Sequence, residues 1–186
     1  MFEYLLQNDQ ELLIYLNNLG SNQWDSLWLI ITNQRNWIPL FAFILFLVIK
    51  AFGWKKGGFT ILMMILFVAF SDQFTNFVKD FFLRLRPNND LLINTQLRTL
   101  INPQSHSFYS GHAATSTAFI VFVILLLKET YRYIWFLILF PLIFSYSRVY
   151  LGVHFPLDIF TGMLAGSLLA IIYYRLYMLL DKKLFS

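Results

Sequence analysis

The sequence predicts an all-α integral membrane protein, a helical bundle with five transmembrane helices preceded by amphipathic helices at the membrane interface. The first supporting observation is the composition. Of the 186 residues, 58% are hydrophobic and 13% are charged, whereas a soluble domain carries about 25% charged residues. The second observation is that the apolar residues form long runs separated by short polar segments, as membrane-spanning helices require. The length leaves room for one domain, which we expect to cover residues 1–186.

The N-terminal segment, residues 1–34, contains no Lys or Arg. Its first apolar residues fall partly at helical spacing after Asn8-Asp9, which is a helix-start signal. A second apolar piece covers residues 24–31. Neither piece reaches the roughly 20 apolar residues that a membrane span needs. We therefore predict two amphipathic interfacial helices here. The alternative is that this segment adds a sixth span.

Five further apolar stretches are predicted to cross the membrane: residues 37–49, 59–78, 113–127, 133–146 and 159–180. A basic turn at Lys50 and residues 54–58 joins the first two stretches. The longest polar connection, residues 80–108, joins the second and third. A connection of this length in a compact protein usually has a function. Residues 37–180 are thus the expected transmembrane core.

Charge placement predicts the orientation of the bundle. If the spans alternate, one side collects most of the basic residues: Lys50, Lys55, Lys56, Lys128, Arg132, Arg175, Lys182 and Lys183. By the positive-inside rule this side is cytoplasmic. The remaining cations of the core lie on the opposite side, where orientation alone disfavours them: Lys79, Arg84, Arg86, Arg98 and Arg148. Anion binding is the simplest reason for their position. We expect a multi-pass protein of a bacterial-type inner membrane, with this site on the periplasmic or extracellular side.

Three motifs lie at span ends on that same side. They are Lys79 to Arg86-Pro87, then Ser110-Gly111-His112, and finally Ser147-Arg148 through His154 to Asp158. Because all three motifs face one side of the membrane, they can converge without an unusual topology.

The first requirement of phosphoryl transfer is an anion site, and the motifs contain the groups for one. Lys79, Arg86 and Arg148 outweigh the roughly two negative charges of a phosphate. The Ser110-Gly111 pair at a predicted helix start offers backbone N–H groups and the positive end of the helix dipole to an anion. These five residues are therefore the predicted phosphate-binding set.

The second requirement is a nucleophile and a proton carrier. His154 would attack phosphorus, and Asp158, about one helical turn later, would orient the imidazole. His112 would protonate the leaving oxygen and then activate water. We expect no metal ion and no cofactor, because the guanidinium and ammonium groups stabilise the charge that a metal would otherwise stabilise.

At these residues the chain resembles the type 2 phosphatidic acid phosphatase family, a superfamily shared with the vanadium haloperoxidases. The resemblance covers roughly residues 58–175 and departs at Tyr109, where the family usually has Pro. It implies the same catalytic and phosphate-binding roles for the three motifs. It also implies a lipid phosphatase that works through a phosphohistidine, with a lipid phosphate and the bilayer as its partners. We expect no nucleic-acid partner and no obligatory protein partner.

Several alternatives remain. The family implies undecaprenyl pyrophosphate, phosphatidylglycerol phosphate, phosphatidic acid and lipid A phosphates as candidate substrates. A lipid phosphotransferase would use the same site. The rival from another class is a catalytically inert transport or anion-binding protein, against which the intact His112, His154 and Asp158 argue. The remaining polar residues stay unassigned: His106, Arg84, Arg98 and Asp72.

Overall fold

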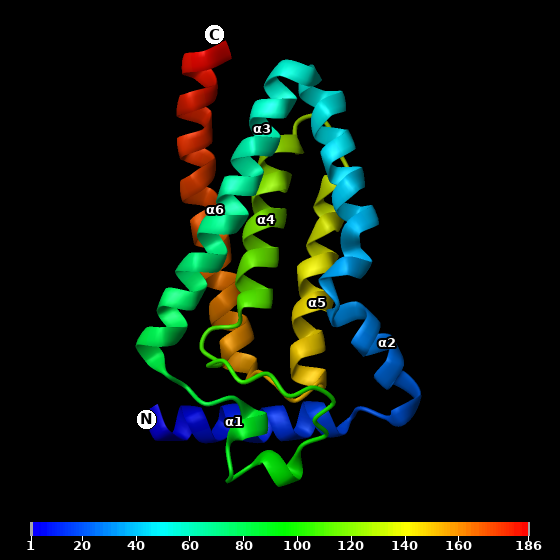
Figure 1. Ribbon diagram of the computed structural model, residues 1–186, viewed down its shortest axis with the longest axis vertical. Coiled ribbons are helices and arrows are strands. Elements are labelled where there is room, and N and C mark those ends of the chain that lie inside the picture. The colour runs from blue at the N-terminus through cyan, green and yellow to red at the C-terminus, as the bar shows by residue number, and fades with distance from the viewer. Residues whose placement is uncertain (1, 186) are drawn as a thin grey trace.

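Helix α3 (Ile38–Phe82) is the longest helix in this computed structural model, and it folds back on itself at Gly53. Gly53 has φ 71° and ψ 176°, a conformation that glycine adopts without the steric cost of a Cβ. Its two arms, residues 38–52 and 54–82, therefore run in opposite directions (Figure 1). The break lies just before residues 54–58 of the predicted basic turn, and Gly57 of that segment lies inside the second arm. A Cβ there would come 2.9 Å from Ile49 Cδ1, so Gly57 lets the two arms approach closely.

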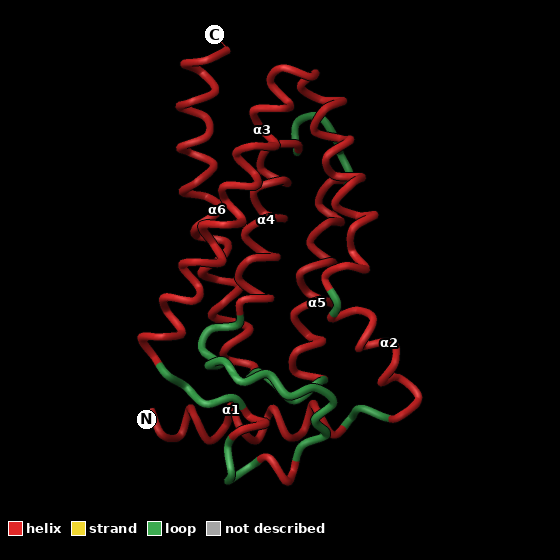
Figure 2. The backbone as a smooth tube through the Cα atoms, in the orientation of Figure 1, coloured by secondary structure: helices red, strands yellow, loops and turns green. Residues whose placement is uncertain are grey.

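All regular structure among the described residues, 2–185, is helical (Figure 2). The other α-helices are α1 (Phe2–Asn18), α2 (Asn22–Thr32), α4 (Gly111–Leu127), α5 (Leu139–Tyr150) and α6 (Pro156–Phe185). Short 3-10 helices are η1 (Gln34–Trp37), η2 (Pro87–Asn89), η3 (Asn94–Gln96) and η4 (Ile134–Ile138). The predicted all-α class is confirmed, and residues 1 and 186 of the predicted domain lie outside the described range.

Two stretches are long and apolar enough to cross a membrane. They are Gln34–Asn89, with mean hydropathy 2.0, and Pro156–Phe185, with 1.6. In each of them only 17% of the most apolar 18 residues are buried. Their apolar side chains therefore face outward, which suits contact with lipid and would be costly in water. Helix α4 and the segment Ile134–Tyr150 are apolar but shorter.

Helix α4 lies at the centre of the bundle, between α3, α5 and α6 (Figure 1). Its contact with α6 is close because two glycines of α6 face it. A Cβ on Gly162 would lie 2.8 Å from the carbonyl oxygen of Ser110, and one on Gly166 would overlap that of Ala114. Small residues of this kind let helix backbones approach. The packing holds the start of α6 against the start of α4, where two of the three motifs lie.

Both helices of the N-terminal segment are present. Helix α1 lies across the end of the bundle, where residues 83–110 also lie (Figures 1 and 2). Leu13 of α1 is fully buried and packs against Val149 and Phe155, which flank the turn between α5 and α6. In α2, the ring of Trp28 stacks on that of Tyr150 with centroids 5.1 Å apart. Both helices therefore cover the end of the bundle that carries the motifs.

Candidate active site

The three motifs meet at one end of the bundle, the lower end in Figure 1. Lys79 lies in the last turn of α3, Ser110 caps α4, and Arg148 lies in the last turn of α5. His154 follows in the turn before α6, and Asp158 lies in the first turn of α6. The convergence follows from topology, because consecutive helices of the bundle alternate in direction.

His154 is buried, with 1% of its surface exposed, and both of its ring nitrogens have partners. Nδ1 lies 3.3 Å from Asp158 Oδ2, and Nε2 lies 2.9 Å from Arg86 Nη1. A guanidinium can only donate a hydrogen bond, so Nε2 is the acceptor and carries the lone pair. The ring proton is therefore on Nδ1, where Asp158 accepts it. This arrangement selects one tautomer and directs the Nε2 lone pair toward Arg86.

Burial and positive charge together lower the pKa of His154 well below its usual range. Burial is the larger cause, and the charges of Arg86, Arg148 and Lys79 add to it. The imidazole is therefore neutral at neutral pH. A neutral imidazole is the form that can act as a nucleophile.

Asp158 is fully buried and holds four polar contacts with its neighbours. Oδ2 accepts from the backbone N–H of Phe155 at 3.0 Å, besides facing His154, and Oδ1 accepts from Arg84 Nη1 at 2.7 Å. Its backbone carbonyl accepts from the N–H of Ser110 at 3.1 Å. The carboxylate therefore has no freedom to leave the imidazole without breaking other bonds.

Arg86 is 4% exposed and ties the polar connection to the turn that carries His154. Its Nε donates to the carbonyl of Ser105 at 2.6 Å, and Nη2 donates to the Ser105 hydroxyl at 2.9 Å. Nη1 donates to the carbonyl of Val153 at 3.0 Å as well as to His154. None of these acceptors carries a full negative charge.

Arg148 and Lys79 likewise lack a carboxylate partner among the described residues. Arg148 is 5% exposed, donates from Nη1 to the hydroxyl of Thr32 at 2.7 Å, and leaves its buried Nε without a partner. A Cβ on Gly111 would lie 3.8 Å from Lys79 Nζ, so the ammonium sits beside the start of α4. Buried cations without counter-charges are costly, and the charges of Lys79, Arg86 and Arg148 all act on His154.

The start of α4 supplies the remaining groups. The hydroxyl of Ser110 accepts from the N–H of Ala113 at 3.4 Å and so caps the helix. Gly111 has no side chain to block the first turn, whose N–H groups and dipole favour an anion. The ring of His112 stacks on Phe144 with centroids 4.9 Å apart. This contact holds the imidazole at the border between the cations and the apolar interior.

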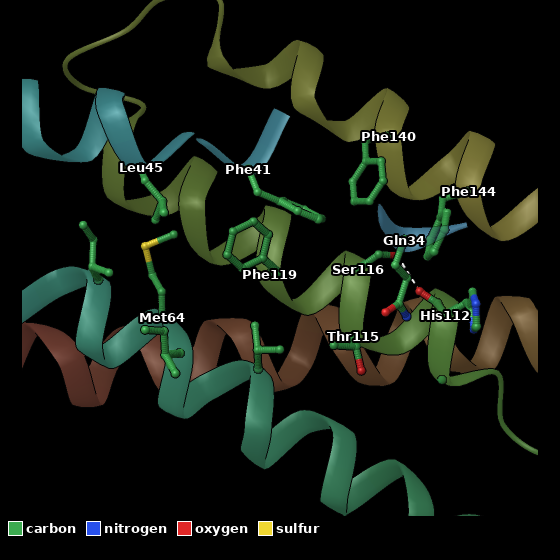
Figure 3. A pocket seen from close by; sticks show the side chains of 14 residues that line it. Gln34, Phe41, Leu45, Met64, His112, Thr115, Ser116, Phe119, Phe140 and Phe144 are labelled. Atoms are coloured by element: carbon green, nitrogen blue, oxygen red, sulfur yellow. Dashed lines mark hydrogen bonds between the residues drawn. The ribbon is translucent and has the colours of Figure 1, made fainter. Parts of the chain in front are cut away.

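An apolar pocket of about 370 Å³ begins at His112 and runs into the bundle (Figure 3). Gln34 and His112 lie at one end, and Leu45 and Met64 lie at the other. Both arms of α3 contribute to its walls, together with α4 and α5. From His112 to Phe119 along α4 the pocket follows a rise of seven residue steps, roughly 10 Å at the α-helical rise.

The structure corrects the expectation that every cation at this end serves an anion. Arg84 pairs with Asp158 and with Asp9, at 2.7 and 2.8 Å, and Arg98 pairs with Asp25 at 2.9 Å. Sequence reasoning missed Asp9 and left Arg84 unassigned. The only available signal was that Arg84 lies within the first motif.

Of the other unassigned polar residues, Asp72 is exposed and accepts from Asn76 Nδ2 at 3.5 Å. Tyr109, at the departure from the family pattern, is buried, and its ring meets that of Phe108 at an edge with centroids 6.2 Å apart. Neither residue forms a hydrogen bond to His112 or His154 in this structure.

The geometry brings three cations without carboxylate partners among the described residues, the start of a helix and a neutral histidine together at the end of an apolar helical bundle. The chain belongs to the PAP2 superfamily, whose model matches residues 57–181. This confirms the resemblance to the type 2 phosphatidic acid phosphatase family, which rested on motif spacing alone.

Three known proteins show how similar the chain is to others. It is 33% identical over 171 residues to a lipid A 4'-phosphatase of Bacteroides thetaiotaomicron, a match over 90% of this chain and 76% of that protein. It is 34% identical over 133 residues to an undecaprenyl-diphosphatase of Sulfolobus acidocaldarius, a match over 70% of this chain and 58% of that protein. In fold it is similar to a transmembrane PAP2 type phosphatidylglycerolphosphate phosphatase from Bacillus subtilis, with TM-score 0.74 and 20% identity over 97% of this chain and 88% of that one.

Proposed function

We propose that this protein is an integral-membrane, metal-independent lipid phosphatase that works through a phosphohistidine on His154. One observation carries the proposal. Three cations lack a carboxylate partner among the described residues, Arg86 and Arg148 being buried and Lys79 half-buried, and they act on a neutral imidazole whose Nε2 lone pair faces Arg86. A tetrahedral anion with about two negative charges would neutralise this region and present its phosphorus to Nε2.

In the first step, Nε2 of His154 would attack phosphorus as the bond to the lipid oxygen breaks. His112 would give its proton to that oxygen, and the lipid alcohol would leave. The phosphorylated ring keeps its proton on Nδ1 and is cationic, so Asp158 would stabilise it. In the second step, His112 would take a proton from water as the water oxygen attacks phosphorus and the P–N bond breaks. Inorganic phosphate is the second product.

Arg86 has a distinct part in this sequence. Its Nη1 donates to the nucleophilic nitrogen of His154 at 2.9 Å. A phosphate oxygen carries charge and is a better acceptor than a neutral imidazole. We therefore expect Arg86 to turn toward a bound phosphate, which frees the lone pair of His154 at the moment when it is needed.

The apolar pocket supports a lipid as the carrier of the phosphate. It opens beside His112, which would face the leaving oxygen, and its walls are apolar side chains of three helices. An acyl or prenyl chain fits such a pocket, whereas the chain of a water-soluble phosphate ester does not need one. The relatives named lipid A 4'-phosphatase and undecaprenyl-diphosphatase make a lipid A type phosphate our first candidate substrate and undecaprenyl pyrophosphate our second.

We further propose a single domain with five membrane crossings, two of them made by the arms of α3, and with α1 and α2 at the periplasmic interface. The basic side of the bundle would be cytoplasmic. Single cysteines test this orientation cleanly, because the chain has none. A cysteine at Asn89 should react with a membrane-impermeant reagent in intact spheroplasts, and one at Lys55 only after lysis. The reverse pattern would place the site in the cytoplasm.

The function itself is tested with purified protein and a panel of lipid A, undecaprenyl, phosphatidylglycerol and phosphatidic acid phosphates. Release of inorganic phosphate from at least one lipid, insensitive to chelators, supports the proposal. Phosphate that appears on an added acceptor lipid and not in solution would identify a phosphotransferase. Binding without turnover of any substrate would favour the inert alternative.

A further inference from the structure

A line of polar contacts connects helix α1 to the proposed nucleophile, His154, through two residues that the mechanism above does not use. Arg84 Nη2 donates to Asp9 Oδ2 at 2.8 Å, and Arg84 Nη1 donates to Asp158 Oδ1 at 2.7 Å. Asp158 faces His154 Nδ1 at 3.3 Å. The guanidinium thus bridges a carboxylate of α1 and the carboxylate that orients the imidazole.

Asp9 makes a second contact that bears on the same carboxylate. Its Oδ1 accepts from the backbone N–H of Leu157 at 2.8 Å. Leu157 precedes Asp158 in the first turn of α6, where helix N–H groups have no partner within the helix. Asp9 therefore caps α6 from outside and fixes the backbone that carries Asp158, while Arg84 fixes its side chain.

The setting of Arg84 suits a positioning residue. Its guanidinium carbon lies 3.8 Å from the centre of the Phe155 ring, so the ring supports the flat face of the group. The two nitrogens that form the ion pairs belong to one rigid fork, which keeps a set angle between Asp9 and Asp158. A lysine has one charged nitrogen and would not reproduce this geometry.

Helix α1 is itself held firmly, so it is a suitable anchor. Asn17, two turns beyond Asp9, donates from Nδ2 to the carbonyl oxygens of Tyr150 at 2.7 Å and Arg98 at 3.2 Å. Its Oδ1 accepts from the backbone N–H of Arg98 at 2.7 Å. Burial raises the pKa of Asp9, and Arg84 and the Leu157 N–H oppose that rise. Asp9 is thus a buried carboxylate whose burial is compensated by Arg84 and the Leu157 N–H.

We propose that Arg84 and Asp9 are positioning residues, which hold Asp158 so that His154 keeps its proton on Nδ1 and its lone pair on Nε2. Helix α1 is then part of the active-site support and not only an interfacial anchor. The effect on turnover rests on the proposed function, whereas the effect on the tautomer does not.

The test uses the full-length protein and conservative variants. Arg84→Gln and Asp9→Asn should lower kcat by roughly 10- to 100-fold, the range known for residues that orient a ligand or catalytic group through a hydrogen bond. KM should stay within about threefold, because neither residue faces the phosphate. The double variant should lose little more than Arg84→Gln alone, since contacting residues in one network are not additive. Asp9→Asn keeps an oxygen for the Leu157 N–H, which protects the fold.

The chain offers a matched control in Arg98→Gln. This variant breaks an ion pair of the same kind, from the same connection to α2, with Arg98 Nη2 2.9 Å from Asp25 Oδ2. Its kcat should stay within about threefold of the wild type. Equal losses of kcat in Arg84→Gln and Arg98→Gln, or full activity in both Arg84→Gln and Asp9→Asn, would overturn the proposal.

A second readout does not depend on turnover. The chain has three histidines, so ¹⁵N labelling of histidine gives a simple imidazole spectrum. His154 should show one tautomer, protonated on Nδ1, in the wild type and in Arg98→Gln, and a mixture of tautomers in Arg84→Gln. An unchanged tautomer in Arg84→Gln would contradict the inference even if no lipid substrate were hydrolysed. A wild type that hydrolyses no lipid on the panel would instead refute the proposed function.

Discussion

Two sets of cations lie at the same end of the bundle, and they differ in what neutralises them. Arg84 and Arg98 form ion pairs with carboxylates of α1, α2 and α6 at 2.7 to 2.9 Å. Lys79, Arg86 and Arg148 have no such pair among the described residues. The partners of Arg86 and Arg148 are hydroxyls, backbone carbonyls and an imidazole.

The presence or absence of a carboxylate partner distinguishes cations that stabilise the fold from cations that we assign to ligand binding. A buried charge costs several kcal/mol when nothing opposite compensates it. The paired set joins the N-terminal helices to the long connection and so stabilises the fold. The unpaired set makes the fold less stable on its own, and its cost is recovered only when an anion binds. We therefore propose that the unpaired cations are the part of this end that binds a ligand.

The largest expected effect is loss of the nucleophile. His154→Ala should lower kcat by roughly 10⁴-fold or more, because the covalent route disappears. His106→Ala is the matched control, since it removes a histidine of the same polar end that lies outside the three motifs. Activity of His154→Ala above a few per cent of the wild type, measured by phosphate release, would exclude His154 as the nucleophile.

The two sets of cations should respond in opposite ways to substitution. Arg148→Met should lower kcat/KM by about 10²- to 10³-fold, since it removes a group that stabilises transition-state charge. Without a bound anion it should also raise the free energy of unfolding by about 1 kcal/mol, because an uncompensated buried charge is gone. Arg98→Met should leave kcat/KM nearly unchanged and lower thermal stability.

Thermal unfolding in detergent and initial rates on the same samples measure both quantities. If Arg148→Met unfolds at a lower temperature than the wild type in phosphate-free buffer, Arg148 stabilises the fold. The proposed distinction between fold-stabilising and ligand-binding cations would then be wrong.

The pH dependence of kcat/KM tests whether the unpaired cations act on His154. Because burial and the three unpaired cations lower the pKa of His154, its protonated, inactive form appears only below the usual value of about 6.5. The acid limb of kcat/KM due to His154 should therefore lie below pH 6.5. In Arg86→Gln the limb should move up toward 6.5, since the largest charge acting on the imidazole is removed. A limb that stays in place would show that Arg86 does not act on His154.

The smallest effect is expected in the apolar pocket. Val68→Trp places a large ring in the wall of the pocket, whereas Leu66→Trp, on the exposed side of the same helix, does not. We expect Val68→Trp to raise KM for a long-chain lipid phosphate by roughly tenfold and to leave a short-chain phosphate unaffected. Equal KM values for both variants on the long-chain lipid would mean that the chain binds elsewhere.

That the three motifs meet at one end of the bundle could be predicted from the sequence, whereas the residues that support them could not. His112, His154 and Asp158 were identifiable because their motifs end spans that face one side, and alternation of helices brings span ends together. The bonds from Asp9 to Arg84 and from Thr32 to Arg148 join residues 75 and 116 positions apart. Hydrophobic periodicity does not report which face of an N-terminal helix meets a distant loop. These contacts depend on tertiary packing and could not be derived from local pattern.

The turn of α3 is a second feature whose position could not be predicted from the sequence alone. A glycine pair at residues 57–58 is a reasonable turn signal, yet the chain turns at Gly53, which takes a positive φ. Gly57 is used for close packing of the two arms. Sequence alone does not separate a glycine needed for its backbone conformation from one needed for its small size.

Competition between vanadate and lipid phosphate tests the central claim most directly. Vanadate adopts the five-coordinate geometry of phosphorus during transfer, and a site complementary to that geometry binds such mimics more tightly than substrate. We predict competitive inhibition of the wild type that chelators do not affect. The inhibition constant should rise by at least about 100-fold in Arg148→Gln and stay unchanged in Arg98→Gln. Equal inhibition of the two variants, or inhibition that requires an added divalent metal, would contradict the assignment of the unpaired cations to the phosphate.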